Sequence, residues 1–324
     1  MGEPMDKLLL ALDYGGTKHT AAILRVGEQA WAAHSRVYSP HDPDASYDQA
    51  TMRSMAHGLM MQVPGQLAAI GVSFGGPVDA QRGLVRLSHH VPGWEETPLR
   101  QMLESEFGVP VAVDNDANVA AFGEWRFGAG QGATSLLYVT VSTGIGGGWV
   151  LEGRVWSGAD GMAGEIGHVV VNPGGMPCVC GQQGCLEAEA CGPALAAKAR
   201  DRLAADPATG PVLAGLASGN PDAVTGEMLA RAAAAGDPLA LAVLDEGAAM
   251  LGAGLGGAIN LVNPQRVVLG GGVTKSGDRW WRIVRETARH HVLPQTRVEI
   301  IPAAMSDDAP LWGAAALAEK LLNR

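Results

Sequence analysis

The segment from residue 164 to residue 187 constrains the fold of this chain more than any other. It contains three of the four cysteines, Cys178, Cys180 and Cys185, with His168 ten positions upstream. Three thiolates and one imidazole suit a closed tetrahedral zinc site, which leaves no open position for a substrate on the metal. A redox role for Cys178 and Cys180 is the alternative, although a CxC spacing beside a histidine is more typical of Zn²⁺. We therefore expect a structural zinc.

Composition and charge exclude several classes of protein. The chain has 324 residues, 47% hydrophobic and 17% charged, which is typical of a globular protein with room for two domains. A formal net charge of -10 without a long basic run argues against a nucleic-acid partner. The longest apolar run, residues 247–262, is shorter than the ~20 residues that span a bilayer, so we predict a buried helix and no membrane partner.

The cysteines and the N-terminus indicate the compartment. The first residues lack the basic and apolar regions of a secretory signal. Few cysteines, three of them clustered, indicate metal binding rather than disulfides. We therefore expect a cytoplasmic protein.

Two distant stretches repeat one pattern: a strand, a glycine-rich turn with a threonine, and a returning strand. The first predicts antiparallel strands at residues 8–13 and 20–26, and the second predicts strands at 136–141 and 149–151. A strand predicted at residues 266–269 ends in a further glycine cluster. Strands that alternate with predicted helices indicate an α/β architecture with two related lobes. Helices are predicted at residues 47–61, 99–107, 117–127, 279–291 and 309–322.

The three glycine turns are candidates for phosphate binding. Glycines let backbone N–H groups converge on phosphate oxygens, and threonine hydroxyls add donors. Asp13, at the end of the first strand, could hold Mg²⁺ through water. The other candidates are Gly15, Gly16, Thr17, Lys18, Thr143, Gly144, Gly146, Gly270, Gly271 and Gly272. Ordinary hairpin turns are the alternative, and neither a Walker P-loop nor a dinucleotide fingerprint is present.

Asp116 is the candidate catalytic base. It follows a strand predicted at residues 109–114 and precedes a predicted helix. Active-site residues of open α/β sheets tend to lie at such junctions. A carboxylate there can accept the proton of a substrate hydroxyl as its oxygen attacks phosphorus. A helix N-cap is the alternative role for this aspartate.

Together these motifs resemble the ROK family (repressors, open reading frames and sugar kinases), and most closely its bacterial glucokinase-type members. The resemblance covers nearly the whole chain. The motifs that carry it are two phosphate motifs at residues 12–18 and 142–148, a sugar-side loop at 75–79, a catalytic motif at 114–118, a zinc signature at 164–187 and an adenosine-side motif at 269–273. Residues 89–94 depart from the family pattern, in which Asn-Leu precedes the tryptophan.

The resemblance implies a fold and an activity. The fold is the two-lobed actin-like ATPase (ribonuclease H-like) fold with a cleft, and we expect lobes of residues 1–116 plus 310–324 and 117–309. The activity is ATP-dependent phosphorylation of a hexose, glucose first, with Mg²⁺ bound to ATP and a structural Zn²⁺. Family precedent suggests a homodimer or homotetramer.

The resemblance also implies the residues of the site. Asp116 would be the base, and the zinc ligand His168 would also contact the sugar through its second ring nitrogen. The residues implied to bind the sugar are Gly76, Asn115, Asp116, Glu165, His168 and Glu187.

Two alternatives stay open. One is a kinase for fructose, mannose or an N-acetylated aminosugar, because pocket shape sets that choice. The other is a sugar-sensing transcriptional regulator of the same family, which would carry an N-terminal winged helix-turn-helix. The first predicted strand begins at Leu8, so we expect no such module. The presence of both Asp13 and Asp116 favours an enzyme.

Overall fold

The computed structural model describes residues 6–88 and 90–322, which leaves His89 of the 89–94 loop outside the description. Packing divides these residues into two compact units. Unit 1 contains residues up to 134, residues 148–163 and residues from 303 onward, and unit 2 contains residues 135–147 and 164–302. Packing units and hinged lobes are different divisions of a chain, so the expected lobes, 1–116 plus 310–324 and 117–309, stay a prediction.

Unit 1 is built on a five-stranded sheet in the order β3-β2-β1-β4-β7. As predicted, β1 (Lys7–Tyr14) pairs antiparallel with β2 (Lys18–Arg25). The structure also shows that β1, β4 (Gln66–Phe74) and β7 (Val111–Asn115) are parallel. The edge strand β3 (Trp31–Tyr38) was not predicted, because its half-buried residues form no apolar run. A short hairpin, β5 (Val78–Asp79) and β6 (Leu84–Val85), follows β4.

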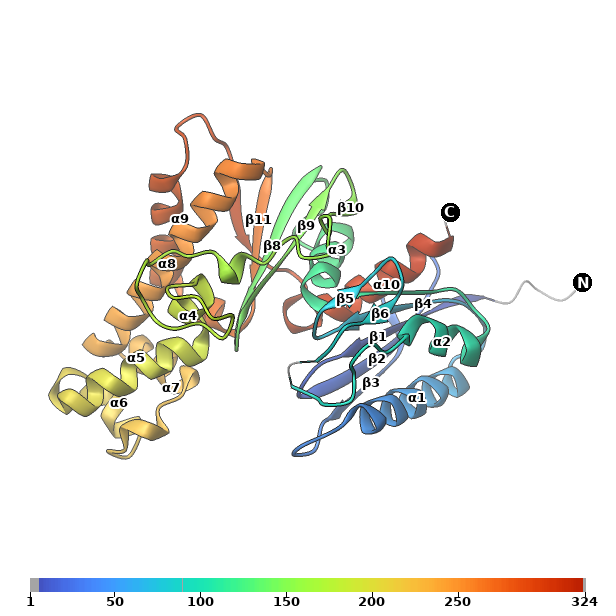
Figure 1. Ribbon diagram of the computed structural model, residues 1–324, viewed down its shortest axis with the longest axis horizontal. Coiled ribbons are helices and arrows are strands. Elements are labelled where there is room, and N and C mark those ends of the chain that lie inside the picture. The colour runs from blue at the N-terminus through green and yellow to red at the C-terminus, as the bar shows by residue number, and fades with distance from the viewer. Residues whose placement is uncertain (1–5, 89, 323–324) are drawn as a thin grey trace, which may run out of the picture. The chain divides into compact units, whose positions relative to one another are not determined.

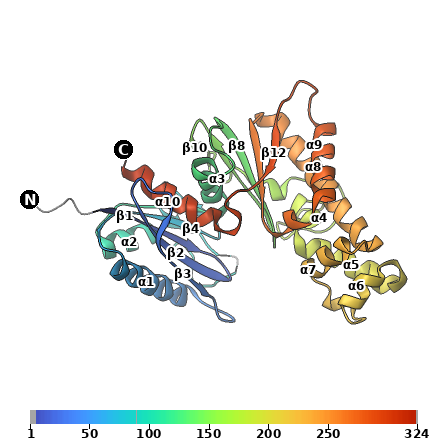
Figure 2. The ribbon, with the colours of Figure 1, turned by 180° about the vertical axis from the view of Figure 1, so that it is seen from behind.

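Helices cover both faces of this sheet. The helices α1 (Ala45–Gln62) and α2 (Leu99–Phe107) lie on one face and α10 (Ala309–Leu322) on the other, as the opposite views in Figures 1 and 2 show. Alternate β1 residues, such as Leu8 and Leu10, join α1 and α2 in one apolar core. Gly71 of β4 lies against α10, since an added Cβ would collide with the Ala314 carbonyl. The helix α3 (Asp116–Phe127) packs along α10.

The second sheet has the order β10-β9-β8-β11-β12. Its strands are β8 (Ser135–Val141), β9 (Ile145–Leu151), β10 (Arg154–Val155), β11 (Arg266–Gly270) and β12 (Glu299–Pro302), with β8, β11 and β12 parallel. The return strand begins at Ile145, four residues before the predicted start. Gly147 lies within β9 and not in the turn before it. A Cβ at this position would collide with the Gly164 carbonyl, so close packing requires glycine here.

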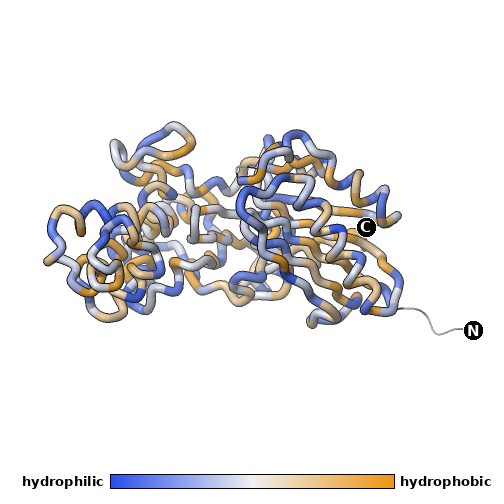
Figure 3. Tube along the Cα trace, turned by 90° about the horizontal axis from the view of Figure 1, so that it is seen from below, coloured by the Kyte–Doolittle hydropathy of each residue, from blue (hydrophilic) through white to orange (hydrophobic). Residues whose placement is uncertain are grey.

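The helices of unit 2 follow the metal segment. They are α4 (Leu186–Ala190), α5 (Gly192–Ala205), α6 (Pro211–Leu216), α7 (Gly226–Ala234), α8 (Pro238–Val262) and α9 (Asp278–His291). Single 3₁₀ turns lie at Ile166–His168, Pro207–Thr209, Pro221–Ala223, Gly272–Lys275 and, in unit 1, Ser306–Asp308. The helix α8 is long and apolar enough to cross a membrane, but 61% of its most apolar window is buried within the structure. It is a core helix, as predicted, and hydrophobic residues run through the interior of each unit (Figure 3).

Candidate active site and metal centre

The parallel strands of unit 1 bring three predicted motifs to one edge of the sheet. The strand register places Asp13 beside Ser73 and Ser73 beside Asp114, at the carboxyl ends of β1, β4 and β7. Crevices at this edge are where ligands bind in open α/β sheets. The Gly75 amide donates to the Tyr14 carbonyl at 2.9 Å, which ties the sugar-side loop to the first phosphate turn.

Asp13 and the first glycine turn are held in place by hydrogen bonds. The Gly15 amide donates to the Lys18 carbonyl at 3.2 Å, which closes the turn at Gly15, Gly16, Thr17 and Lys18. The Ser73 hydroxyl donates to Asp13 Oδ1 at 2.8 Å, and Asp13 is 7% exposed. Burial raises the pKa of the Asp13 carboxyl, against the Ser73 hydrogen bond and the nearby charge of Lys18, which lower it. A divalent cation near Asp13 would favour the ionised form.

Asn115, and not Asp116, caps the helix α3. The Asn115 Oδ1 accepts from the amides of Ala117 at 3.0 Å and Asn118 at 3.4 Å, while Nδ2 donates to the Gly76 carbonyl at 3.0 Å. The alternative role for Asp116 as N-cap is therefore wrong. The half-buried Asp116 accepts the Ala117 amide on Oδ1 at 2.8 Å, and its Oδ2 faces Gly75. Gly76, Asn115 and Asp116 thus lie together.

Sequence reasoning gave no separate role to three buried polar residues of unit 1, Asp114, His19 and Asp48. Burial raises the pKa of Asp114 to about 6, although it accepts hydrogen bonds from the Asn115 amide and Asn118 Nδ2. His19, 0% exposed, places Nε2 2.7 Å from Asp48 Oδ1, and Trp94 Nε1 donates to Asp48 Oδ2 at 3.0 Å. The signal was a single polar residue, His19 or Asp114, inside an apolar strand pattern.

In unit 2 the carboxyl ends of β8 and β11 meet in the same way. The second phosphate turn, residues 142–146, donates its Ile145 amide to Glu187 Oε2 at 2.8 Å and accepts the Gly192 amide on the Ser142 carbonyl at 2.8 Å. Gly271, at φ 90°, lies so close to the Val141 backbone that a Cβ would collide with it. The structure therefore groups Thr143, Gly144 and Gly146 with the third glycine cluster, Gly270, Gly271 and Gly272, and with Glu187.

The four predicted metal ligands converge in unit 2. One ligand atom from each of His168, Cys178, Cys180 and Cys185 lies within 4.8 Å of the other three. The His168 Nδ1 to Cys178 Sγ distance and the Cys180 Sγ to Cys185 Sγ distance are both 3.6 Å. A tetrahedral zinc with bonds of about 2.0–2.3 Å separates its ligand atoms by roughly 3.5–3.8 Å. The donor set and spacing fit Zn²⁺.

The metal segment also orients the neighbouring side chains. His168 turns Nδ1 to the thiols and Nε2 to Glu165, whose Oε2 is 3.9 Å away. Burial raises the pKa of the Cys185 thiol to about 12, whereas the hydrogen bond with the Gln182 backbone lowers the pKa of the exposed Cys180. A metal must therefore displace the Cys185 proton. Cys191 is a buried free thiol outside the cluster.

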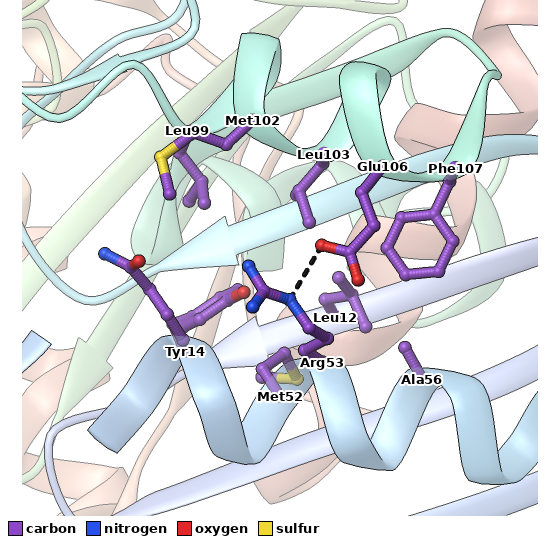
Figure 4. Close-up of a pocket in the computed structure, with 11 residues that line it drawn as sticks. Leu12, Tyr14, Met52, Arg53, Ala56, Leu99, Met102, Leu103, Glu106 and Phe107 are labelled. Carbon is purple, nitrogen blue, oxygen red and sulfur yellow. Dashed lines mark hydrogen bonds and ion pairs between the residues drawn. The ribbon is translucent and has the colours of Figure 1, made fainter. Parts of the chain in front are cut away.

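A separate cavity in unit 1 is not lined by the candidate site residues. It lies between α1 and α2 and is lined by residues such as Leu12, Met52 and Leu103, beside an ion pair from Arg53 Nε to Glu106 Oε2 at 2.8 Å (Figure 4). Its volume of about 10 Å³ is at the limit for one water molecule, so it cannot hold a sugar.

Comparison with known proteins agrees with this arrangement. The model of the ROK family matches residues 9–321. The glucokinase of Streptomyces coelicolor is 34% identical over 316 residues, which cover 97% of this chain and 98% of that protein. The crystal structure of a ROK family glucokinase from Streptomyces griseus in complex with glucose and AMPPNP matches with a TM-score of 0.82 at 34% identity, over 97% of this chain and 99% of that one.

A regulator of the same family is also similar. The structure of a ROK family transcriptional regulator, a homolog of the E. coli Mlc protein, matches with a TM-score of 0.87 at 26% identity, over 98% of this chain and 78% of that one. Kinases and regulators thus share the fold found here. Because the family match spans residues 9–321, this chain belongs to the ROK family and has its actin-like ATPase fold.

Proposed function

We propose that this protein is an ATP-dependent sugar kinase that transfers the γ-phosphate of ATP to the 6-hydroxyl of glucose. The observation that carries the proposal is the sheet edge of unit 1, where Asp116 lies beside the Gly75–Gly76 loop and the Asp13 turn lies along the same edge. The similarity to two Streptomyces glucokinases supports glucose as the sugar.

Asp116 is the proposed general base. Its neighbour Asn115 is the N-cap of α3, so the Asp116 side chain is not needed as the helix cap. At the start of α3 the carboxylate lies at the positive end of the helix dipole, which favours a negative charge there. It accepts the hydroxyl proton as the sugar oxygen attacks phosphorus, and the product is the sugar 6-phosphate with ADP.

The glycine turns are proposed to bind ATP. In unit 1, Gly15, Gly16, Thr17 and Lys18 would offer amides, a hydroxyl and a cation to phosphate oxygens, with Asp13 holding Mg²⁺ through water. The Mg²⁺ carried by ATP supplies positive charge to the transferring phosphate. In unit 2, the second turn with Thr143, Gly144 and Gly146 is proposed for phosphate. The cluster of Gly270, Gly271 and Gly272 is proposed for the adenosine side.

The sugar contacts are proposed for both units. Gly76, Asn115 and Asp116 would contribute from unit 1. Glu165, His168 and Glu187 would contribute from unit 2, where a structural zinc on His168, Cys178, Cys180 and Cys185 keeps them in place. Carboxylates and a neutral imidazole with one nitrogen on metal suit sugar hydroxyls, because metal ligation fixes the tautomer of the second nitrogen.

Steady-state assays test this proposal. ADP formation, coupled to a reporter enzyme, is followed with ATP and glucose, fructose, mannose, N-acetylglucosamine or N-acetylmannosamine. We expect the highest kcat/KM for glucose, and a higher value for another sugar would reassign the substrate within the kinase class. Absence of sugar-dependent ADP formation, together with tight sequence-specific DNA binding in a gel-shift screen, would favour the regulator.

Two further properties belong to the proposal. None of the four cysteines forms a disulfide, which suits a reducing cytoplasm. Family precedent suggests a homodimer or homotetramer, which light scattering of the purified protein measures.

A further inference from the structure

A buried ion pair lies beside the metal centre but belongs to none of the sites described above. Glu189 is on α4, two residues after Glu187, and is 2% exposed. Its Oε2 lies 2.5 Å from Lys198 Nζ on α5, and the same Nζ donates to the Glu189 carbonyl at 3.1 Å. Its Oε1 accepts from Asn172 Nδ2 at 3.0 Å and from the Met176 amide at 2.9 Å.

The two donors to Oε1 stand at the ends of the Pro-Gly-Gly turn that connects His168 with Cys178. Glycines leave such a turn with many backbone conformations unless something fixes its ends. A single carboxylate oxygen holds both ends, and the Gly175 amide donates to the Asn172 carbonyl at 2.8 Å, so the Glu189 side chain and this backbone hydrogen bond together close the turn. Gly175 is part of this contact, because a Cβ there would collide with Glu189 Oε1.

The closed turn is also joined to the segment that carries the last metal ligand. The Asn172 amide donates to the Gly184 carbonyl at 3.1 Å, and the Gly184 amide donates to the Met176 carbonyl at 2.8 Å. Cys185 follows Gly184 directly, and Cys178 comes two residues after Met176. The separation of these two thiols therefore depends on the position of the turn.

Lys198 makes the buried carboxylate tolerable. Burial alone raises the pKa of Glu189, but the hydrogen bonds from Lys198, Met176 and Asn172 outweigh burial and hold the pKa below its usual value. The group is an ionised acceptor whose counter-charge lies on α5. Loss of Lys198 alone would leave an uncompensated buried charge.

We propose that Glu189, with Lys198 as its counter-ion, is the positioning residue of the metal centre: it holds the turn at residues 172–176 so that the Cys178 thiol reaches the other three ligand atoms. The inference rests on the zinc site of the proposed function. Glu189 is not one of the four residues whose ligand atoms converge, so it acts through the turn and not on the metal. Residues that orient metal ligands typically change metal affinity 10–100-fold when they are removed.

Two double variants separate the hydrogen bonds from the charges. Glu189→Gln with Lys198→Met keeps an acceptor oxygen for Asn172 and Met176 but has no buried charge. Glu189→Leu with Lys198→Met has neither. Zinc affinity is measured on the full-length, metal-stripped protein by competition with a chromogenic chelator, without sugar or ATP. The control is Glu246→Gln. This change breaks an exposed ion pair with Arg202, which lies on α5 as Lys198 does.

We expect the Gln/Met variant and the control to bind zinc within about threefold of wild type, and the Leu/Met variant to lose at least ~10-fold. Equal zinc affinity in both double variants, or an equal loss in both, would overturn the role of the turn. If the Leu/Met variant does not fold, Asn172→Ala, which removes one donor at a partly exposed residue, decides. It is expected to weaken zinc binding, and unchanged affinity would overturn the proposal.

The readout is independent of catalysis. A chain that binds zinc in this pattern but phosphorylates no sugar contradicts the kinase proposal and leaves the positioning role intact. A chain that phosphorylates glucose but binds no zinc contradicts the positioning role alone.

Discussion

Asn115 Nδ2 donates a 3.0 Å hydrogen bond to the carbonyl oxygen of Gly76, while Asn115 Oδ1 caps the helix that begins with Asp116. One side chain thereby joins the ends of β4 and β7 and supplies the cap that aspartate would otherwise provide. In the proposed mechanism this leaves the carboxylate beside it for proton transfer.

Replacement of that carboxylate should stop chemistry and spare binding. We expect Asp116→Ala to lower kcat at least ~10³-fold, because general-base catalysis contributes about 10²–10⁴. The Kd for glucose, measured by calorimetry, should stay within a few fold of wild type, since Asn115 and Gly76 remain. Asp222→Asn, at an exposed residue of the 3₁₀ turn Pro221–Ala223, is the control. A near wild-type kcat for Asp116→Ala would remove Asp116 from the role of base.

Removal of zinc should weaken sugar binding. The metal segment carries Glu165 and His168 and leads through Cys185 directly into the helix with Glu187, so its disorder would misplace all three. We expect the chelated protein to bind glucose at least ~10-fold more weakly and to recover on addition of Zn²⁺. Cys180→Ala should behave like the chelated protein and Cys191→Ala like wild type. Unchanged sugar affinity after complete zinc removal, verified by metal analysis, contradicts this prediction.

The buried Asp114 should make stability depend on pH. Its pKa rises from 3.8 to about 6 in the folded protein. Between these values the folded state holds a proton that the unfolded state has lost, so stability falls as pH rises through this window. Above pH 6 the cost reaches roughly 3 kcal/mol, at about 1.4 kcal/mol for each pKa unit.

Asp114→Asn should remove that cost while it keeps an acceptor for the Asn115 amide. We expect urea unfolding to show the variant more stable than wild type at pH 8, by up to ~3 kcal/mol, with the gain shrinking towards pH 4. A gain of the same size at both pH values would show that ionisation of Asp114 is not its source.

The His19–Asp48–Trp94 network should be strongly coupled. His19→Leu leaves the Asp48 carboxylate buried with Trp94 as its remaining partner in this network, which we expect to cost about 3–5 kcal/mol in urea unfolding. His19→Leu with Asp48→Leu should cost less than the sum of the two single changes. His57→Gln, in an exposed pair with Glu106, should cost at most about 1 kcal/mol. Additive effects of His19→Leu and Asp48→Leu would show that the pair is not coupled.

Local patterns predicted much of this protein. Apolar runs predicted β1, β2, β8 and β11, and the spacing of the cysteines to His168 predicted a group whose ligand atoms do converge. Each of these features is set by residues that are near neighbours in the sequence, so a local pattern is enough to predict it. The edge strand β3 was missed because half-buried residues carry little periodic signal. The predicted start of β9 was four residues late, because consecutive glycines are typical of a turn, whereas Gly147 is required by close packing within the strand.

The sequence by itself determined the family motifs, the ligand set of the metal and the strand ends at which the candidate residues lie. Tertiary structure decided which partner each buried or half-buried polar group finds: Asn115 with Gly76, Glu187 with Ile145, Glu189 with Lys198 and His19 with Asp48. A buried polar atom must be paired, but its own neighbours in sequence do not specify the partner. Lys198 lies nine residues from Glu189, but strand register and helix packing bring the other three partners from 29 to 42 residues away, and these depend on the whole core.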